Sequence, residues 1–206
     1  MPFEKYSLNT GEDDFVILTV DAVQQPNYAR KNRYAVCEEI YLAVVLGLVI
    51  GILTVIGQKY LPINLNFLAN SGSVWLIPAF LFSCFEKGGW IQSVATTIVC
   101  LLGCVYGYYI FEAVLNQHAF SLAESALLWT VVAFISGAVF GFGAYVANQE
   151  NSKLKYLGMN LLPAVFTAEG LNNVIHIEDY SHMVPAVVMK IVIGVVLCLV
   201  INRKTP

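Results

Sequence analysis

Long runs of apolar residues, separated by short polar segments, make up the chain after residue 39. The hydrocarbon core of a bilayer is about 30 Å thick, and about 20 helical residues cross it. Within lipid only helices and closed barrels satisfy their own backbone hydrogen bonds, and runs of this length fit helices. The pattern predicts six transmembrane helices, at residues 40–56, 65–84, 90–111, 126–147, 154–175 and 183–201.

Polar residues interrupt the second and the fifth of these runs. The second contains the sequence Asn-Ser-Gly-Ser at residues 70–73, which favours a break in the helix. A broken helix exposes backbone groups, which a membrane tolerates only beside protein or a water-filled cavity. We therefore expect the break to border protein or such a cavity.

The basic residues predict the orientation, because cytoplasmic loops of membrane proteins carry an excess of lysine and arginine. With six helices and a cytoplasmic N-terminus, nine basic residues lie inside and Lys59 alone lies outside, while Lys190 falls within a helix. Without the second helix, three lysines would change to the wrong side. Both termini are therefore predicted to be cytoplasmic. The nine are Lys5, Arg30, Lys31, Arg33, Lys87, Lys153, Lys155, Arg203 and Lys204.

Composition supports a membrane protein of the cell membrane. Of the 206 residues, 58% are hydrophobic and 12% are charged, and the net charge is −3. Soluble chains average about 25% charged residues, and nucleic-acid binders need basic patches, so both classes are excluded. The expected fold class is an all-α polytopic membrane protein. It has a polar cytoplasmic N-terminal tail (residues 1–39), a transmembrane domain (40–202) and a cytoplasmic C-terminus (203–206).

Two ionisable residues lie inside the apolar body. Glu169 is six residues from the outer end of the fifth predicted helix, and Lys190 is seven residues from the outer end of the sixth. At 1.5 Å per residue both lie roughly 10 Å below the outer boundary. Consecutive antiparallel helices tend to pack together, so we expect a Glu169–Lys190 ion pair. Pairing lowers the cost of placing either charge in a low dielectric.

Further polar residues lie at or above that depth. Asn172 and Asn173 continue the helix face of Glu169, and Asn70 and Ser71 lie at the expected break. Together with Glu169 and Lys190, these four residues predict a solute pocket that opens to the outside. Three alternatives stay open: Lys190 extends outward along its stem, Glu169 and the asparagines only join helices, or the helix boundaries are misplaced.

A metal site and an active site have little support. His118, His176 and His182 all fall outside, near carboxylates, and such groups suit transition metals. Their spacing matches no tight metal motif, and a solvated acidic loop explains them equally. No catalytic motif such as Gly-x-Ser-x-Gly or His-Glu-x-x-His occurs. We expect no enzyme activity and no cofactor.

A short internal similarity suggests two related halves. The sequence at residues 76–80 resembles that at residues 161–166, at an offset of 85 residues. Three helices in each half would give a 3+3 inverted repeat, which marks many transporter folds. Chance is the alternative, since leucine, isoleucine and proline are common in membrane helices.

Two resemblances add to this interpretation. Residues 65–75, together with the six-helix layout, resemble an uncharacterised family of small bacterial integral membrane proteins. The layout also resembles the S-components of energy-coupling-factor transporters, whose first helix carries small residues at every fourth position. Here the corresponding residues are Ala43, Gly47 and Gly51. This second resemblance implies an ABC-type ATPase and a transmembrane coupling subunit as partners.

Two functions are carried forward. The first is a small membrane transporter, or a substrate-binding transporter subunit, for a small molecule or ion. The second is a non-transporting partner, such as an assembly, immunity or regulatory subunit, that acts through its cytoplasmic tail.

Overall fold

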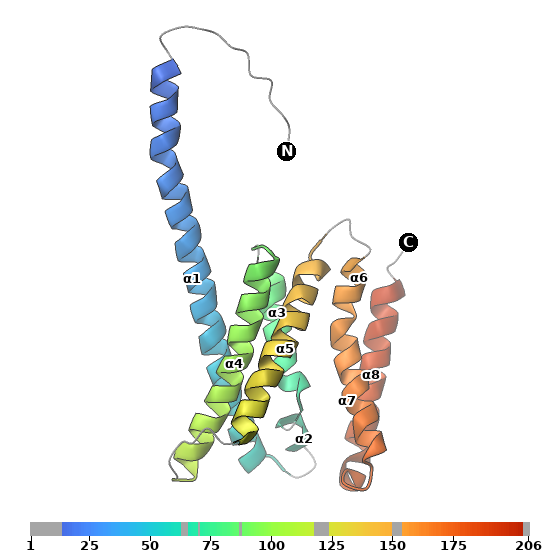
Figure 1. Cartoon of the computed structure of the whole chain (residues 1–206). Helices are drawn as coiled ribbons and strands as arrows, with labels where there is room; N and C mark the ends of the chain where they lie inside the picture. Colours follow the sequence, from blue (N-terminus) through green and yellow to red (C-terminus); the bar gives the residue numbers. More distant parts are fainter. Residues whose placement is uncertain are drawn as a thin grey trace. The chain divides into compact units, whose positions relative to one another are not determined.

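The structure is a computed structural model that describes residues 14–62, 66–69, 71–86, 88–117, 124–149 and 154–203. Over these residues the protein is all-α (Figure 1). The chain divides into two compact units, residues 1–38 and 39–206. The first contributes the beginning of helix α1, and the second holds every other described element.

Eight α-helices and one short 3-10 helix follow one another along the described chain. They are α1 (Asp14–Tyr60), α2 (Asn66–Ala69), α3 (Ser73–Phe85), α4 (Trp90–Leu115), α5 (Glu124–Ala147), α6 (Leu154–Met159), α7 (Leu161–Ile175), η1 (Ser181–Met183) and α8 (Val184–Arg203).

Four segments are long and apolar enough to cross a membrane: Val36–Tyr60 of α1, α4, Ser125–Ala147 of α5, and α8. Because several such helices occur in one chain, the protein is of the multi-pass membrane type. The two remaining predicted helices are both broken, since neither residues 65–84 nor residues 154–175 form one continuous helix.

Local sequence explains both breaks. The first lies where it is predicted, because α2 ends at Ala69 and α3 begins at Ser73. The second lies at Asn160, between α6 and α7. Pro163 has no backbone N–H, and its ring opposes the carbonyl four residues earlier, at Met159, where α6 ends.

Glycines bring α1 and α4 into backbone contact. A Cβ atom at Gly47 or Gly51 would meet the carbonyl oxygens of Cys100 and Cys104. From the facing helix, a Cβ atom at Gly107 would lie 2.7 Å from the carbonyl oxygen of Leu48. Small residues allow this approach, and in lipid close packing is a main source of helix association.

This contact corrects one interpretation of the sequence. The small-residue stripe, which resembles a docking surface for a coupling subunit, is buried within the chain: Ala43 is 0% exposed, and Gly47 and Gly51 are buried. Helix α4 occupies it. The stripe is therefore a packing seam of the protein itself.

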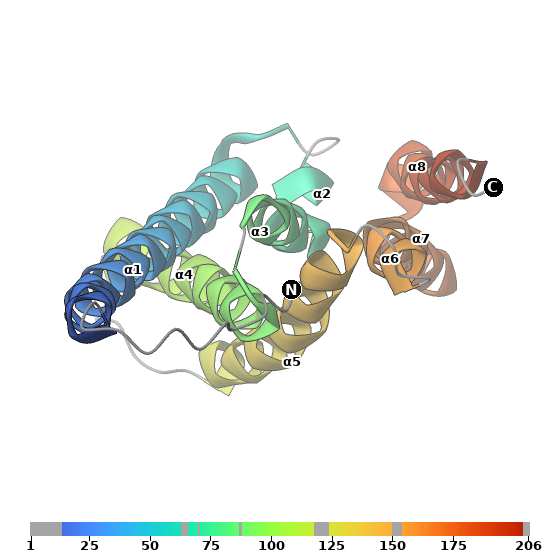
Figure 2. The same ribbon diagram turned by 90° about the horizontal axis from the view of Figure 1, so that it is seen from above.

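Similar seams join the other helices. Between α4 and α5, the Ser93 hydroxyl donates to the carbonyl oxygen of Gly141 at 2.9 Å. Between α7 and α8, a Cβ atom at Gly194 would lie 2.8 Å from the carbonyl oxygen of Pro163. Seen from above, α3 stands in the interior of the bundle, where it contacts α4, α5 and α7 (Figure 2).

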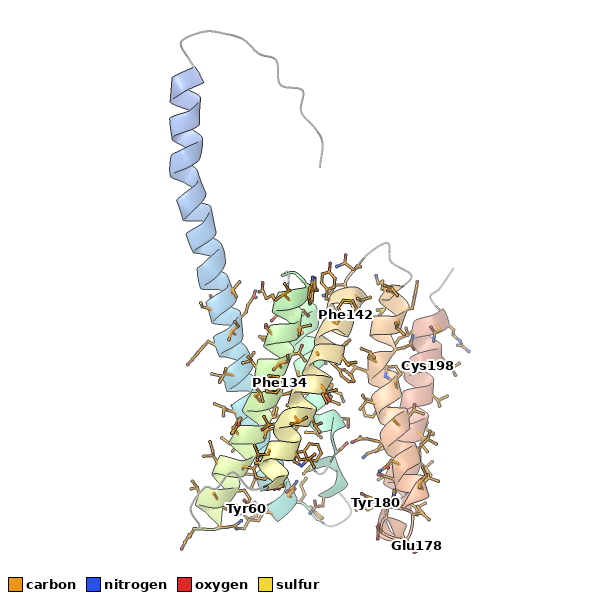
Figure 3. The ribbon with its side chains drawn as sticks, in the orientation of Figure 1. Tyr60, Phe134, Phe142, Glu178, Tyr180 and Cys198 are labelled. Atoms are coloured by element: carbon orange, nitrogen blue, oxygen red, sulfur yellow. The ribbon has the colours of Figure 1, made fainter. Side chains whose placement is uncertain are left out.

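Large apolar side chains cover the outer surface of the helices. Phe134 and Phe142 of α5 are each about half exposed and project from the bundle (Figure 3). Val188 and Val192 of α8 are also more than half exposed. In water such a surface would be costly, and in a bilayer it is the expected lipid-facing side.

The seam between α1 and α4 predicts the sign of the change in the free energy of unfolding when a glycine is replaced by alanine. Alanine normally stabilises a helix by about 0.5–1 kcal/mol relative to glycine. Gly51→Ala should instead lower the free energy of unfolding by about 1–3 kcal/mol, because the new Cβ would meet backbone atoms. Gly89→Ala is the matched control, since a Cβ there meets nothing within 4 Å. Thermal unfolding in detergent measures both, and a stabilised Gly51→Ala variant would contradict the packing.

Candidate functional site

The break between α2 and α3 is held by a carboxylate from a distant helix. Glu169 of α7 accepts a hydrogen bond from the backbone N–H of Ser73 at 3.3 Å, at the first position of α3. Helix N-termini have unpaired N–H groups and a partial positive charge, so they favour an anion. Gly72, the preceding residue, provides no side-chain cap, and Glu169 supplies the acceptor from outside.

Ser71, Ser73 and Lys190 complete a polar cluster around this carboxylate. The Ser71 hydroxyl donates to Oε2 of Glu169 at 2.6 Å, and the hydroxyls of Ser71 and Ser73 are 2.5 Å apart. The ammonium nitrogen of Lys190 lies 3.5 Å from the same Oε2. Lys190 is 7% exposed and the side chain of Glu169 is 23% exposed, so the ammonium group is withdrawn from solvent and the carboxylate is partly withdrawn. The ion pair expected from matched depth is confirmed.

The other sequence-predicted residues are placed differently. Asn173 is buried, whereas Asn172 and His176 on the same helix are exposed. The His176 ring and its backbone N–H both contact the carbonyl oxygen of Asn172, at 3.0 and 3.1 Å. The predicted polar face of α7 is therefore divided between buried and exposed positions. Asn70 lies outside the described residues.

The histidines do not form a metal centre in the part of the chain that can be assessed. His118 and the side chain of His182 lie outside the described residues. Among the described residues, no group of three or more histidine, cysteine, aspartate or glutamate side chains could hold a metal ion.

A cavity of about 130 Å³ adjoins the polar cluster through Ser71. Residues from α1, α2, α3, α4, α5 and the break between α2 and α3 form its wall. Its lining consists of Thr54, Gln58, Ala69, Ser71, Gly72, Trp75, Tyr108, Tyr109 and Trp129. The cavity therefore lies where the long helices meet the broken one.

Aromatic rings dominate this wall, and their polar tips are bonded to α1. The indole N–H of Trp75 donates to the Thr54 hydroxyl at 2.9 Å, and the Tyr108 hydroxyl donates to Oε1 of Gln58 at 2.8 Å. Buried tryptophan and tyrosine usually find such partners. Sequence reasoning missed these residues. The one signal for them is Trp75, which lies in the middle of the second predicted helix, away from the interfaces where tryptophan is common.

A second cavity, of about 540 Å³, lies at the opposite end of α3 and includes Glu86, Ser93 and Asn148 in its lining. Burial raises the pKa of Glu86 from 4.5 to about 7. The Thr96 hydroxyl opposes this rise in the pKa, and the nearby Glu39 carboxylate adds to it. Glu86 follows the last residue of α3 and lies outside the helical segments.

Glu86 predicts a pH dependence of stability. The folded pKa is above the unfolded one, so the folded state binds more protons between these values and stability falls as pH rises. The contribution is complete below pH 4.5 and is lost as the pH passes about 7. Glu86→Gln should flatten this profile and stabilise the protein at pH 8 by about 1 kcal/mol, after allowance for solvent screening. Unfolding between pH 5 and 8 measures it, and the exposed Glu178→Gln variant should keep the slope.

The ion pair predicts a partial rescue. Glu169→Gln should cost about 3 kcal/mol, because it leaves the buried Lys190 without its counter-charge. Lys190→Met should cost less, since Glu169 keeps its bonds from Ser71 and Ser73. The double variant should recover at least about 1 kcal/mol relative to the sum of the single losses. Strictly additive losses in thermal unfolding would contradict direct coupling.

Comparison with known proteins gives one match. Comparisons with the curated proteins and with the solved structures found none. A family model described as "Family of unknown function (DUF6518)" matches residues 30–206. The expected membership of an uncharacterised family is thereby confirmed, and the match does not extend to the S-components. The chain belongs to this family of unknown function, DUF6518.

Proposed function

We propose that this protein binds a small solute within the membrane and acts as a small transporter or as a substrate-binding transporter subunit. One observation carries the proposal. A buried Glu169–Lys190 pair is bonded to a broken helix through Ser71, and Ser71 also lines a cavity of about 130 Å³.

The chemistry of such an arrangement favours binding over a purely structural role. Charged side chains inside a membrane are costly, and they usually mark solute or proton pathways. Transporters commonly place their sites where helices are discontinuous. A structural ion pair needs neither a helix break nor an adjoining cavity, and this protein has both.

The proposed topology retains six crossings with both termini inside. Residues 66–85 and 154–175 each cover about 30 Å if they cross as broken helices. The excess of basic residues at one side then places the aromatic cavity in the outer half of the membrane. Both broken crossings carry a proline, Pro78 in α3 and Pro163 in α7, which supports the inverted repeat as part of the proposal.

The transmembrane body is favoured over the N-terminal tail as the functional part. The family match covers residues 30–206, so it includes the whole body and only the last part of the tail. Because α4 covers the small-residue stripe, any coupling subunit would need another surface. This favours a self-contained transporter over an S-component.

A ligand screen tests the proposal. A solute that binds the folded state alone stabilises it by about 2.7 kcal/mol at 100 times its Kd. We expect one member of a panel of amino acids, vitamins, amines and metal ions to raise the Tm of the purified full-length protein. Ser71→Ala should weaken that effect at least about tenfold in Kd, because Ser71 joins the cavity to Glu169.

The matched control is Ser125→Ala, at an exposed position on α5, which should respond as the unaltered protein does. Uptake of the same solute into proteoliposomes then separates a transporter from a binding subunit. Absence of stabilisation by every panel member would overturn solute binding. Deletion of residues 1–28 should leave uptake of the solute unaffected. Loss of a co-purifying protein on that deletion would favour the partner hypothesis instead.

A further inference from the structure

We propose that the cavity next to Glu169 is built to hold a small quaternary ammonium ion. This inference rests on the proposed function and names the class of solute.

Four aromatic rings line the cavity and meet one another at steep angles. The centroids of Trp75 and Tyr108 are 6.1 Å apart at an angle of 58°, and those of Trp75 and Trp129 are 5.9 Å apart at 67°. Tyr109 meets Tyr108 edge to face at 5.0 Å. Rings at such steep angles around one space do not stack on one another. A cation within about 6 Å of a ring centroid is attracted by the ring face, most strongly by tryptophan.

The hydrogen-bond donors of the lining are largely used within the protein. The indole N–H of Trp75 and the hydroxyl of Tyr108 donate to α1, and the Thr54 hydroxyl donates to the carbonyl oxygen of Ile50 at 2.8 Å. The Ser71 hydroxyl donates to Glu169. An anion or a carbonyl group would need these donors, and it would find them occupied. A quaternary ammonium ion needs none.

The charges near the cavity leave no open site for an anion. The N-terminus of α3 would attract an anion, but Glu169 already occupies its first N–H group. Lys190 balances the charge of Glu169, yet the group bonded to the cavity wall is the carboxylate. Lys190 and the positive end of α3 together balance the charge of Glu169, so the attraction for a cation comes from the ring faces.

Size and hydration select among cations. A cavity of about 150 Å³ accepts benzene, so the volume of about 130 Å³ suits a group of five or six heavy atoms. Metal ions and simple ammonium keep strong hydration shells and need several oxygen ligands. A tetramethylammonium-sized group is weakly hydrated and fills the space with methyl groups.

Two sources could supply this chemistry: a free solute such as choline, or the headgroup of phosphatidylcholine. The test uses the full-length protein in a maltoside detergent, without choline lipids. Calorimetric titration compares choline with 3,3-dimethylbutan-1-ol, which has the same shape without the charge. We expect choline to bind at least about tenfold more tightly.

Variants locate the site. Trp129→Leu removes a partly exposed ring of the cavity and should weaken choline binding about tenfold while changing the neutral alcohol by less than about threefold. Trp90→Leu is the matched control, because Trp90 is 52% exposed and does not line the cavity. Its affinity for choline should equal that of the unaltered protein.

Repetition in nanodiscs distinguishes the sources. Weaker apparent binding of choline in phosphatidylcholine than in phosphatidylglycerol identifies the lipid headgroup, and equal binding identifies a free solute. Equal affinity for choline and the neutral alcohol would overturn the inference. So would the absence of choline binding while another panel solute binds, and in that case the proposed function still stands. No binding by any solute would overturn both.

Discussion

Close approach of helix backbones at glycine is the constraint on which the structure depends. Lipid chains are as apolar as leucine, so membrane helices gain little from hiding apolar side chains and associate largely through close packing. Gly47, Gly51 and Gly107 let α1 and α4 touch along their backbones. That contact sets Thr54 and Gln58 beside the aromatic face of α4, where Gln58 meets Tyr108. The cavity wall thus follows from the seam.

The broken helix depends on a second contact, made across the bundle. A helix end in lipid with unpaired N–H groups would be costly, and α3 begins at such an end. Glu169 supplies the acceptor there, and Lys190 supplies the counter-charge. Each charge has a structural task, so the pair stabilises the break that gives the cavity its polar side.

The sequence predicted features that depend on order along the chain. Glu169 and Lys190 have about the same predicted depth on consecutive predicted helices, so topology alone predicts that they meet. The break at residues 70–73 follows from local composition, and the end of α6 from Pro163. The cavity was not predictable, because Thr54, Tyr108 and Trp129 come from separate helices whose rotation decides whether they meet. Helices that are apolar on all sides carry little periodicity to fix that rotation. The same ambiguity made the glycine stripe resemble an external docking surface.

The balance of the two opposite charges explains how such a site can be stable within a membrane. An unpaired carboxylate beside an empty cavity would be strongly destabilising, and the Glu169–Lys190 pair avoids this cost. The remaining attraction for a cation comes from ring faces, which require no buried net charge. Donors that are bonded to α1 and to Glu169 also hold the rings in place when no ligand is present. Because these side chains are already fixed, binding costs little of their conformational entropy. The site therefore favours a rigid, weakly hydrated cation over a solute that must be recognised by hydrogen bonds.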